Sequence, residues 1–155
     1  MTRGNHESKN LNKIYGFEGE VLAKYDGKIM DLFSEVFCQL PLSIVLNHQI
    51  IVLHGGLFSQ DGVTLEDIRT QHRNREIPES GIMCELLWSD PCKMNGRQPS
   101  KRGTAIQFGP DIAHQFLDNN NLKILIRSHE VKDAGFEVEA DGRVITIFSA
   151  PNYCD

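Results

Sequence analysis

Hydrophobic and polar positions follow two different periods along the chain, which predicts a mixture of helices and strands. Over residues 20–37 apolar residues recur at Val21, Tyr25, Ile29, Leu32, Phe33 and Val36. Their spacing of three or four residues is typical of one face of an α-helix. Gly27 divides this stretch into two expected helices, and Pro41 ends it. A shorter helix is expected over residues 8–12, with Ser8 as its N-cap.

Short β-rich runs predict strands, four of which pair into hairpins. Asn47-His48 and Asp141-Gly142 are the expected turns, because Asn, Asp and Gly tolerate the backbone angles of tight turns. A further apolar run is expected to form a buried strand that leads to His129. In chain order the five runs cover residues 43–46, 49–53, 123–126, 136–139 and 144–148.

Further helix starts are signalled by capping residues. Thr64 with Asp67 three positions later is a capping pattern, and Gly109-Pro110 places proline at the start of a helix. The buried stripe of that second helix is expected to be Ile112, Phe116 and Leu117. Residues 72–81 and 92–101 are polar and predict loops, whereas 83–88 is a short apolar segment. The mixture of elements predicts an α/β fold.

Composition excludes several functional classes. The chain has 155 residues, a net charge of −5 and 40% hydrophobic residues, which suits one domain over residues 1–155 and argues against nucleic acid as a partner. No apolar run approaches the roughly 20 residues of a membrane helix, and the polar N-terminus is no secretory signal. The four cysteines form no CxxC pair, which favours reduced thiols in the cytoplasm or nucleus.

Three side chains are candidate metal ligands. His54 and His129 each follow an apolar run, and the carboxyl ends of strands are where an α/β sheet presents ligands. Asn5 follows Gly4, which allows a close backbone approach. Two imidazoles and one amide oxygen suit zinc, iron or manganese. A histidine after a strand is also commonly a packed residue, and the residue types alone leave both interpretations open.

Other residues offer complementary chemistry. His6 is a candidate general acid, Arg102 a candidate bidentate anion clamp, and Tyr153 a candidate hydrogen-bond donor. Two of them also have a simpler interpretation: Arg102 as a solvated charge and Tyr153 as a packing residue.

Six motifs in order resemble one enzyme family. They are Arg3-Gly4-Asn5-His6-Glu7, His54-Gly55-Gly56-Leu57, Leu86-Leu87-Trp88-Ser89-Asp90-Pro91, Arg102-Gly103, Arg127-Ser128-His129 and Ser149-Ala150-Pro151-Asn152-Tyr153. Together they resemble the metal-dependent phosphoprotein phosphatases that act on serine and threonine. The segments between these motifs are most similar to the protein phosphatase 5 subgroup. One such segment is Tyr15-Gly16-Phe17-Glu18-Gly19-Glu20-Val21.

The resemblance implies roles for the matching positions. Asn5, His54 and His129 would ligate the second of two metal ions (manganese, iron or zinc), and His6 would protonate the leaving oxygen. Asn5 and Arg102 would contact phosphate, and Tyr153 would line the site. The implied reaction is hydrolysis of phosphoserine and phosphothreonine in phosphoprotein substrates by a hydroxide between the two metals. The implied fold is a calcineurin-like sandwich of two mixed β-sheets flanked by helices.

The chain departs from the family pattern in what it lacks. Two family motifs, Gly-Asp-x-His-Gly and Gly-Asp-x-Val-Asp-Arg-Gly, are absent, and with them the bridging carboxylate and the first-metal ligands. We therefore expect a partial catalytic domain, truncated at both ends, that binds at most one metal. The tetratricopeptide domain through which chaperone complexes would bind is also missing. The alternatives are a non-catalytic form that binds partners, or a single-metal domain without phosphatase activity.

Overall fold

The main sheet has five strands and mixed strand directions. The computed structural model describes residues 1–153. The sheet order is β1-β2-β6-β8-β7; β2, β6 and β8 are parallel, and the two outer strands are antiparallel to their neighbours. Both predicted hairpins and the predicted strand before His129 are therefore confirmed. The strands are β1 (Ser43–Leu46), β2 (Ile50–Leu53), β6 (Ile124–Arg127), β7 (Phe136–Glu139) and β8 (Val144–Ile147).

A smaller sheet includes one strand within a segment that the sequence predicted to be a loop. Its order is β3-β5-β4, with β3 parallel and β4 antiparallel to β5. Its strands are β3 (Asp90–Pro91), β4 (Arg97–Pro99) and β5 (Ile106–Phe108). The prediction of a loop over residues 92–101 was wrong for β4, because Arg97-Gln98-Pro99 offers neither an apolar residue nor alternation. The fold is thus α/β with two mixed sheets flanked by helices, as expected.

The helices begin largely where the capping residues indicate. Thr64 forms a capping box with Asp67, and Pro110 occupies the first turn of α6. Ser8 sits at the N-cap of α1 but makes no capping hydrogen bond, because its hydroxyl donates to the carbonyl of Asn5 (2.9 Å). A short 3₁₀ turn, η1 (Ala140–Gly142), joins β7 to β8. The helices are α1 (Lys9–Ile14), α2 (Phe17–Lys24), α3 (Gly27–Gln39), α4 (Leu65–Arg69), α5 (Ile82–Trp88) and α6 (Pro110–Asn119).

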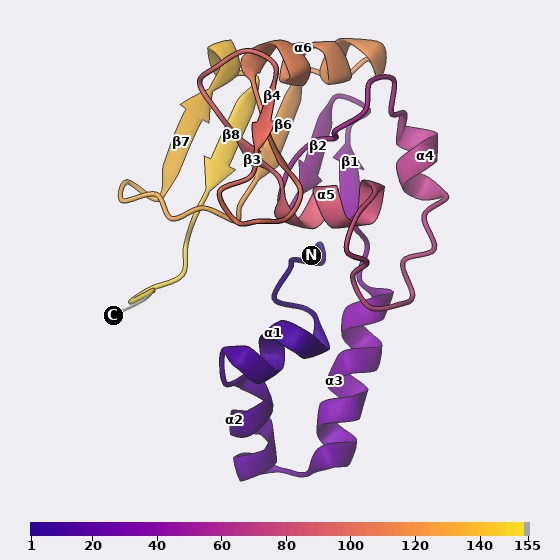
Figure 1. Ribbon diagram of the computed structural model, residues 1–155, viewed down its shortest axis with the longest axis vertical. Coiled ribbons are helices and arrows are strands. Elements are labelled where there is room, and N and C mark those ends of the chain that lie inside the picture. Colours follow the sequence, from indigo (N-terminus) through magenta and orange to yellow (C-terminus); the bar gives the residue numbers. More distant parts are fainter. Residues whose placement is uncertain (154–155) are drawn as a thin grey trace.

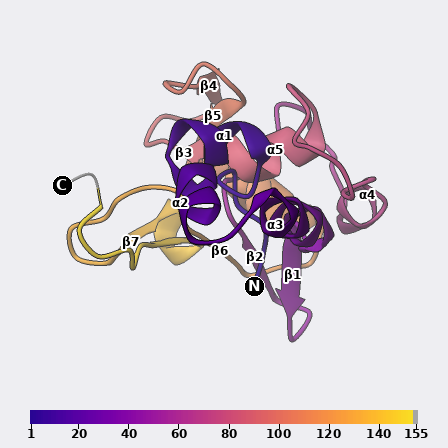
Figure 2. The same ribbon diagram turned by 90° about the horizontal axis from the view of Figure 1, so that it is seen from below.

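The first three helices project from one end of the two sheets (Figure 1). Seen from below, α1, α2 and α3 gather beneath the sheets (Figure 2). Ring contacts hold α2 to α3: the centroid of Phe17 lies 5.2 Å from that of Phe33 and 5.9 Å from that of Phe37. Several apolar side chains of this pair stay exposed, among them Leu22 and Val36. None of the helices within residues 1–153 combines the length and apolar character needed to cross a bilayer.

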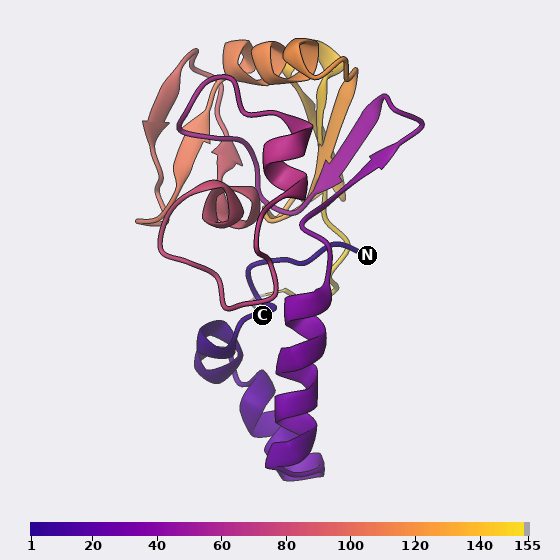
Figure 3. The ribbon, with the colours of Figure 1, turned by 90° about the vertical axis from the view of Figure 1, so that its right-hand side faces the viewer.

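The core lies between the two sheets, and α5 lies at their lower end (Figure 3). Ile51, Leu53 and Leu125 of the main sheet pack in one buried cluster with Leu86 and Leu87 of α5, and each is at most 2% exposed. The loop after β2 runs against α5, where the amide of Gly55 donates to the carbonyl of Leu86 (2.8 Å). This hydrogen bond fixes the position of the loop after β2 relative to α5.

The glycine pair after His54 is required by close packing. A Cβ on Gly56 would lie 2.2 Å from Cε1 of Phe108, and one on Gly55 would lie 2.5 Å from the backbone carbon of Leu87. At this glycine pair the chain passes close to α5 and β5.

We expect Gly56→Ala to lower the free energy of unfolding by about 1–3 kcal/mol, because the added methyl group overlaps a buried ring. The matched control is Gly19→Ala in α2, where an added Cβ would meet no atom within 4 Å. That change should raise stability by about 0.5–1 kcal/mol through helix propensity. Urea unfolding followed by circular dichroism measures both, and equal effects of the two substitutions would contradict the packing argument.

Candidate functional site

Asn5 is held by a buried arginine at the start of the chain. The amide of Arg3 donates to the carbonyl of Pro41 (2.8 Å), and its guanidinium donates to the carbonyls of Glu7 (3.0 Å) and Arg75 (2.8 Å). Arg3 is fully buried and Asn5 is 3% exposed. The Arg3 side chain therefore fixes the turn from which Asn5 projects.

Gly4 lets this turn lie directly against His54. A Cβ at position 4 would stand 2.9 Å from Cε1 of His54 and 2.7 Å from Oε2 of Glu7. The Glu7 carboxylate uses that space to accept a hydrogen bond from the amide of Gly4 (2.8 Å). The close backbone approach predicted for Gly4 is confirmed, and its partner is His54.

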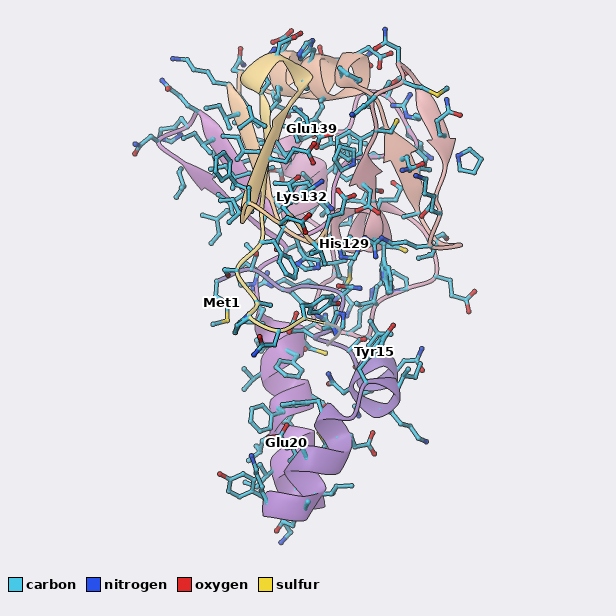
Figure 4. All side chains as sticks on the ribbon, turned by 90° about the vertical axis from the view of Figure 1, so that its left-hand side faces the viewer. Met1, Tyr15, Glu20, His129, Lys132 and Glu139 are labelled. Carbon is cyan, nitrogen blue, oxygen red and sulfur yellow. The ribbon has the colours of Figure 1, made fainter. Side chains whose placement is uncertain are left out.

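The two histidines come from neighbouring parallel strands. His54 follows β2 and His129 follows β6, so both lie at the carboxyl ends of their strands. The amide of Ser128 donates to the carbonyl of His54 (3.1 Å) and joins the two strand ends. His129 has a φ of 73°, in the left-handed region, and its ring meets Trp88 edge-on at 5.8 Å between centroids. Figure 4 labels His129 at the lower end of the sheets.

Three potential ligand atoms converge on one point. Nε2 of His54 lies 2.8 Å from Oδ1 of Asn5 and 3.0 Å from Nδ1 of His129. Bonds of about 2.0–2.2 Å to one ion also place neighbouring ligand atoms roughly 3 Å apart. The spacing and chemistry of the three groups therefore fit a single zinc, iron or manganese ion.

Both histidines are held neutral by their surroundings. Burial, followed by the positive charges of Arg127, His6 and Arg102, lowers the pKa of His54 from 6.5 to about 3. Burial, His54 and the same three charges lower the pKa of His129 to about 2. A neutral imidazole keeps a lone pair for a metal, so no proton has to be displaced at neutral pH.

The donor set is nevertheless small. Within residues 1–153, no group of three or more His, Cys, Asp or Glu side chains gathers as a metal site, and the cluster consists of two imidazoles and one amide. The buried Nε2 of His129 has no hydrogen-bond partner among these residues. No carboxylate in the described chain balances a cation at this point.

Arg102 lies beside the cluster but is already paired. Its Nε donates to Oδ2 of Asp90 (2.6 Å), and one terminal nitrogen donates to Oδ1 of Asp90 (3.3 Å) and to the carbonyl of His129 (3.3 Å). Its side chain is 32% exposed. Asp90 therefore orients the guanidinium, while the second terminal nitrogen makes no hydrogen bond to the residues that the structure describes.

Asp90 and Arg127 are site residues that the sequence analysis did not single out. Arg127 is 1% exposed, and its guanidinium donates to Oδ1 of Asp90 (2.8 Å), to Oε2 of Glu130 (2.6 Å) and to the carbonyl of Gly55 (2.5 Å). Burial lowers the Arg127 pKa, although the neighbouring carboxylates oppose that shift. Both residues stood inside quoted motifs, but only their contact reveals the role.

His6 and Tyr153 differ in their relation to the cluster. His6 is half-buried directly after Asn5, and its ring lies 5.1 Å from that of Tyr15. Tyr153 is 47% exposed and meets Phe148 edge-on at 5.2 Å, in the segment that runs away from the sheets after β8 (Figure 1). The roles predicted for both residues stay predictions.

Comparison with known proteins agrees with the resemblance seen in the motifs. The chain is 63% identical over 155 residues to serine/threonine-protein phosphatase 5 of Arabidopsis thaliana and 61% identical to that of Homo sapiens. It covers 29% and 31% of those proteins, less than a third of their length.

A solved structure extends this agreement to the fold. A Saccharomyces cerevisiae protein serine/threonine phosphatase, described as similar to human phosphatase PP5, superposes with a TM-score of 0.95 at 48% identity. The match covers 99% of this chain and 48% of that one. The family profile of calcineurin-like phosphoesterases matches residues 1–133. On this evidence of sequence and fold, the chain belongs to the calcineurin-like phosphoesterase family.

Proposed function

We propose that this chain carries one metal-binding half of a phosphatase site that hydrolyses phosphoserine and phosphothreonine in proteins. The observation that supports it is that Nε2 of His54 lies 2.8 Å from Oδ1 of Asn5 and 3.0 Å from Nδ1 of His129. The names of the relatives support the substrate class, since both are serine/threonine-protein phosphatases.

Asn5, His54 and His129 would hold one manganese, iron or zinc ion. When bound, such an ion supplies Lewis-acid polarisation of a phosphoryl oxygen and lowers the pKa of a water. The amide of Asn5 is uncharged, so it neutralises none of the charge that the ion would offer to phosphate. A second ion in a complete site would need ligands other than these three.

The chain's own residues would then position and cleave the ester. Arg102, held by Asp90, would donate hydrogen bonds to the phosphoryl oxygens. As water attacks phosphorus, the bond from phosphorus to the serine or threonine oxygen breaks, and His6 would give that oxygen a proton. The products are inorganic phosphate and a free hydroxyl side chain.

A second candidate is a single-metal domain without hydrolysis. It is favoured by the absence of any carboxylate from the histidine and amide cluster within the described residues. Catalytic groups act as a unit, so a site that lacks a bridging carboxylate would retain little activity. The two candidates share the metal ligands and differ only in turnover.

We expect the metal-free chain to bind about one equivalent of Mn²⁺ or Zn²⁺, measured by equilibrium dialysis with elemental analysis. His54→Ala and His129→Ala should each lower the affinity at least about tenfold, because each removes a ligand. His114→Ala is the matched control. His114 lies in α6, and its ring hydrogen-bonds the carbonyl of Ala140 rather than a residue of the histidine cluster. Equal binding by all four proteins would refute the proposed ligand set.

Turnover separates the two candidate functions. The assay measures release of 4-nitrophenol from 4-nitrophenyl phosphate by the metal-loaded chain. Release that is reduced in His6→Ala, while metal binding is unchanged, supports the hydrolase. A rate equal to that of metal in buffer, with one metal bound, supports the single-metal domain.

The lowered histidine pKa values predict a pH-dependent stability. Below pH 6.5 an unfolded chain takes up protons at His54 and His129, whereas the folded chain does so only near pH 3 and 2. The stability contributed by each histidine is therefore present above pH 6.5 and is lost as the pH falls. Between pH 7 and 5 we expect a loss of about 2 kcal/mol per histidine in the metal-free chain.

Urea unfolding in the presence of a chelator measures this loss. His54→Gln and His129→Gln should each remove about half of the pH dependence. His48→Gln, in the exposed turn between β1 and β2, should leave it in place. A pH dependence that is the same in all three variants would contradict the burial argument.

Arg102→Ala should weaken the binding of inorganic phosphate to the metal-loaded chain about tenfold, because a hydrogen-bonded positive charge is lost. Titration calorimetry measures the affinity. Arg97→Ala is the control for net charge, since Arg97 pairs with Asp61 instead. If the two variants bind phosphate equally, the clamp role of Arg102 is wrong.

A further inference from the structure

A hollow lies between the two sheets, and Asn5, His54 and His129 are not among the residues that line it. Its volume is about 350 Å³, and it is lined on one side by the β7–β8 hairpin and on the other by β3, β5 and the start of α6. Phe108, Pro110, Ala113 and Val144 give it an apolar lining. This volume and lining are typical of a site for a small organic molecule.

One polar group in this cavity has no partner. Glu139 lines the cavity from β7, and its Oε2 is buried without a hydrogen bond to any residue that the structure describes. Figure 4 labels Glu139 in the space between the yellow hairpin and the salmon strands of the second sheet. A buried carboxylate oxygen without a donor is costly, so the cavity offers a strong acceptor to an incoming donor.

The neighbouring carboxylate is already satisfied. Glu137 lies two residues earlier on the same side of β7, and it forms an ion pair and hydrogen bond with Lys132. Lys93 lines the same cavity and lowers the pKa of the Glu137 carboxyl after the larger effect of Lys132. Burial raises the pKa of Glu139 and the charge of Lys132 opposes that shift, but no donor in the described chain reaches Oε2 of Glu139, which is therefore the acceptor left for a ligand.

We propose that this cavity binds a small amine with an aromatic or branched aliphatic body, whose ammonium group donates to Glu139. The apolar body would occupy the space beside Phe108 and Val144, which removes apolar surface from water. The ammonium group would supply the missing donor at Oε2, and such charge-assisted hydrogen bonds are stronger than neutral ones. The chain's net charge of −5 also favours a cationic ligand.

The test uses 2-phenylethylamine as the probe, with 2-phenylethanol as the neutral analogue of the same shape. Binding is followed by amide chemical-shift changes in the whole chain. Glu139→Gln should weaken binding of the amine about tenfold and leave binding of the alcohol unchanged. Glu137→Gln is the matched control, because it removes an equal charge two residues away on the same strand and should weaken the amine far less.

A second variant tests the cavity itself. Ala113→Phe should fill the apolar space and abolish binding of both probes, while circular dichroism confirms that the variant is folded. The proposal is overturned if no shifts arise at residues lining the cavity, or if Glu137→Gln and Glu139→Gln weaken the amine equally. Tighter binding of N-acetyl-lysine amide than of 2-phenylethylamine would also overturn it, in favour of a lysine side chain from a peptide.

Discussion

The buried guanidinium of Arg127 joins the parts from which the site is assembled. It extends from the end of β6 and donates hydrogen bonds to three groups: the carbonyl of Gly55, Asp90 at the start of β3, and Glu130. A charge that is only 1% exposed is tolerated when its hydrogen bonds are satisfied by opposite charges. Loss of any one partner would leave a buried charge unbalanced, so the strand end, the loop after β2 and the second sheet are fixed relative to one another.

The geometry of the histidine cluster depends on this arrangement. Arg127 holds Asp90, and Asp90 in turn holds Arg102, whose guanidinium reaches the carbonyl of His129. The same two arginines add to the burial that keeps His54 and His129 neutral. One network therefore orients the guanidinium nearest the cluster and also sets the protonation state of the imidazoles.

The sequence predicted those features that are governed by local chemistry. The hairpins, the capping box of Thr64 and the meeting of His54 with His129 follow from alternation, turn residues and the rule for strand ends. Strand β4 of the second sheet was missed because Arg97-Gln98-Pro99 has no strand pattern of its own and forms a strand only by pairing with β5. Arg127 and Asp90 were not assigned roles because they are 37 residues apart, and a buried charge is recognised only by the partner that balances it.

The charge around the cluster favours joint binding of a cation and an anion. The three proposed ligand groups are neutral, and Asp90 and Glu130 are already paired with arginine. Arg102 and Arg127 both stand close enough to lower the histidine pKa values. A cation that binds alone therefore meets no unpaired negative charge, and Arg102 opposes it. A phosphate group beside the ion would attract both the ion and Arg102. Since linkage is reciprocal, phosphate should strengthen metal binding by the same factor as the metal strengthens phosphate binding.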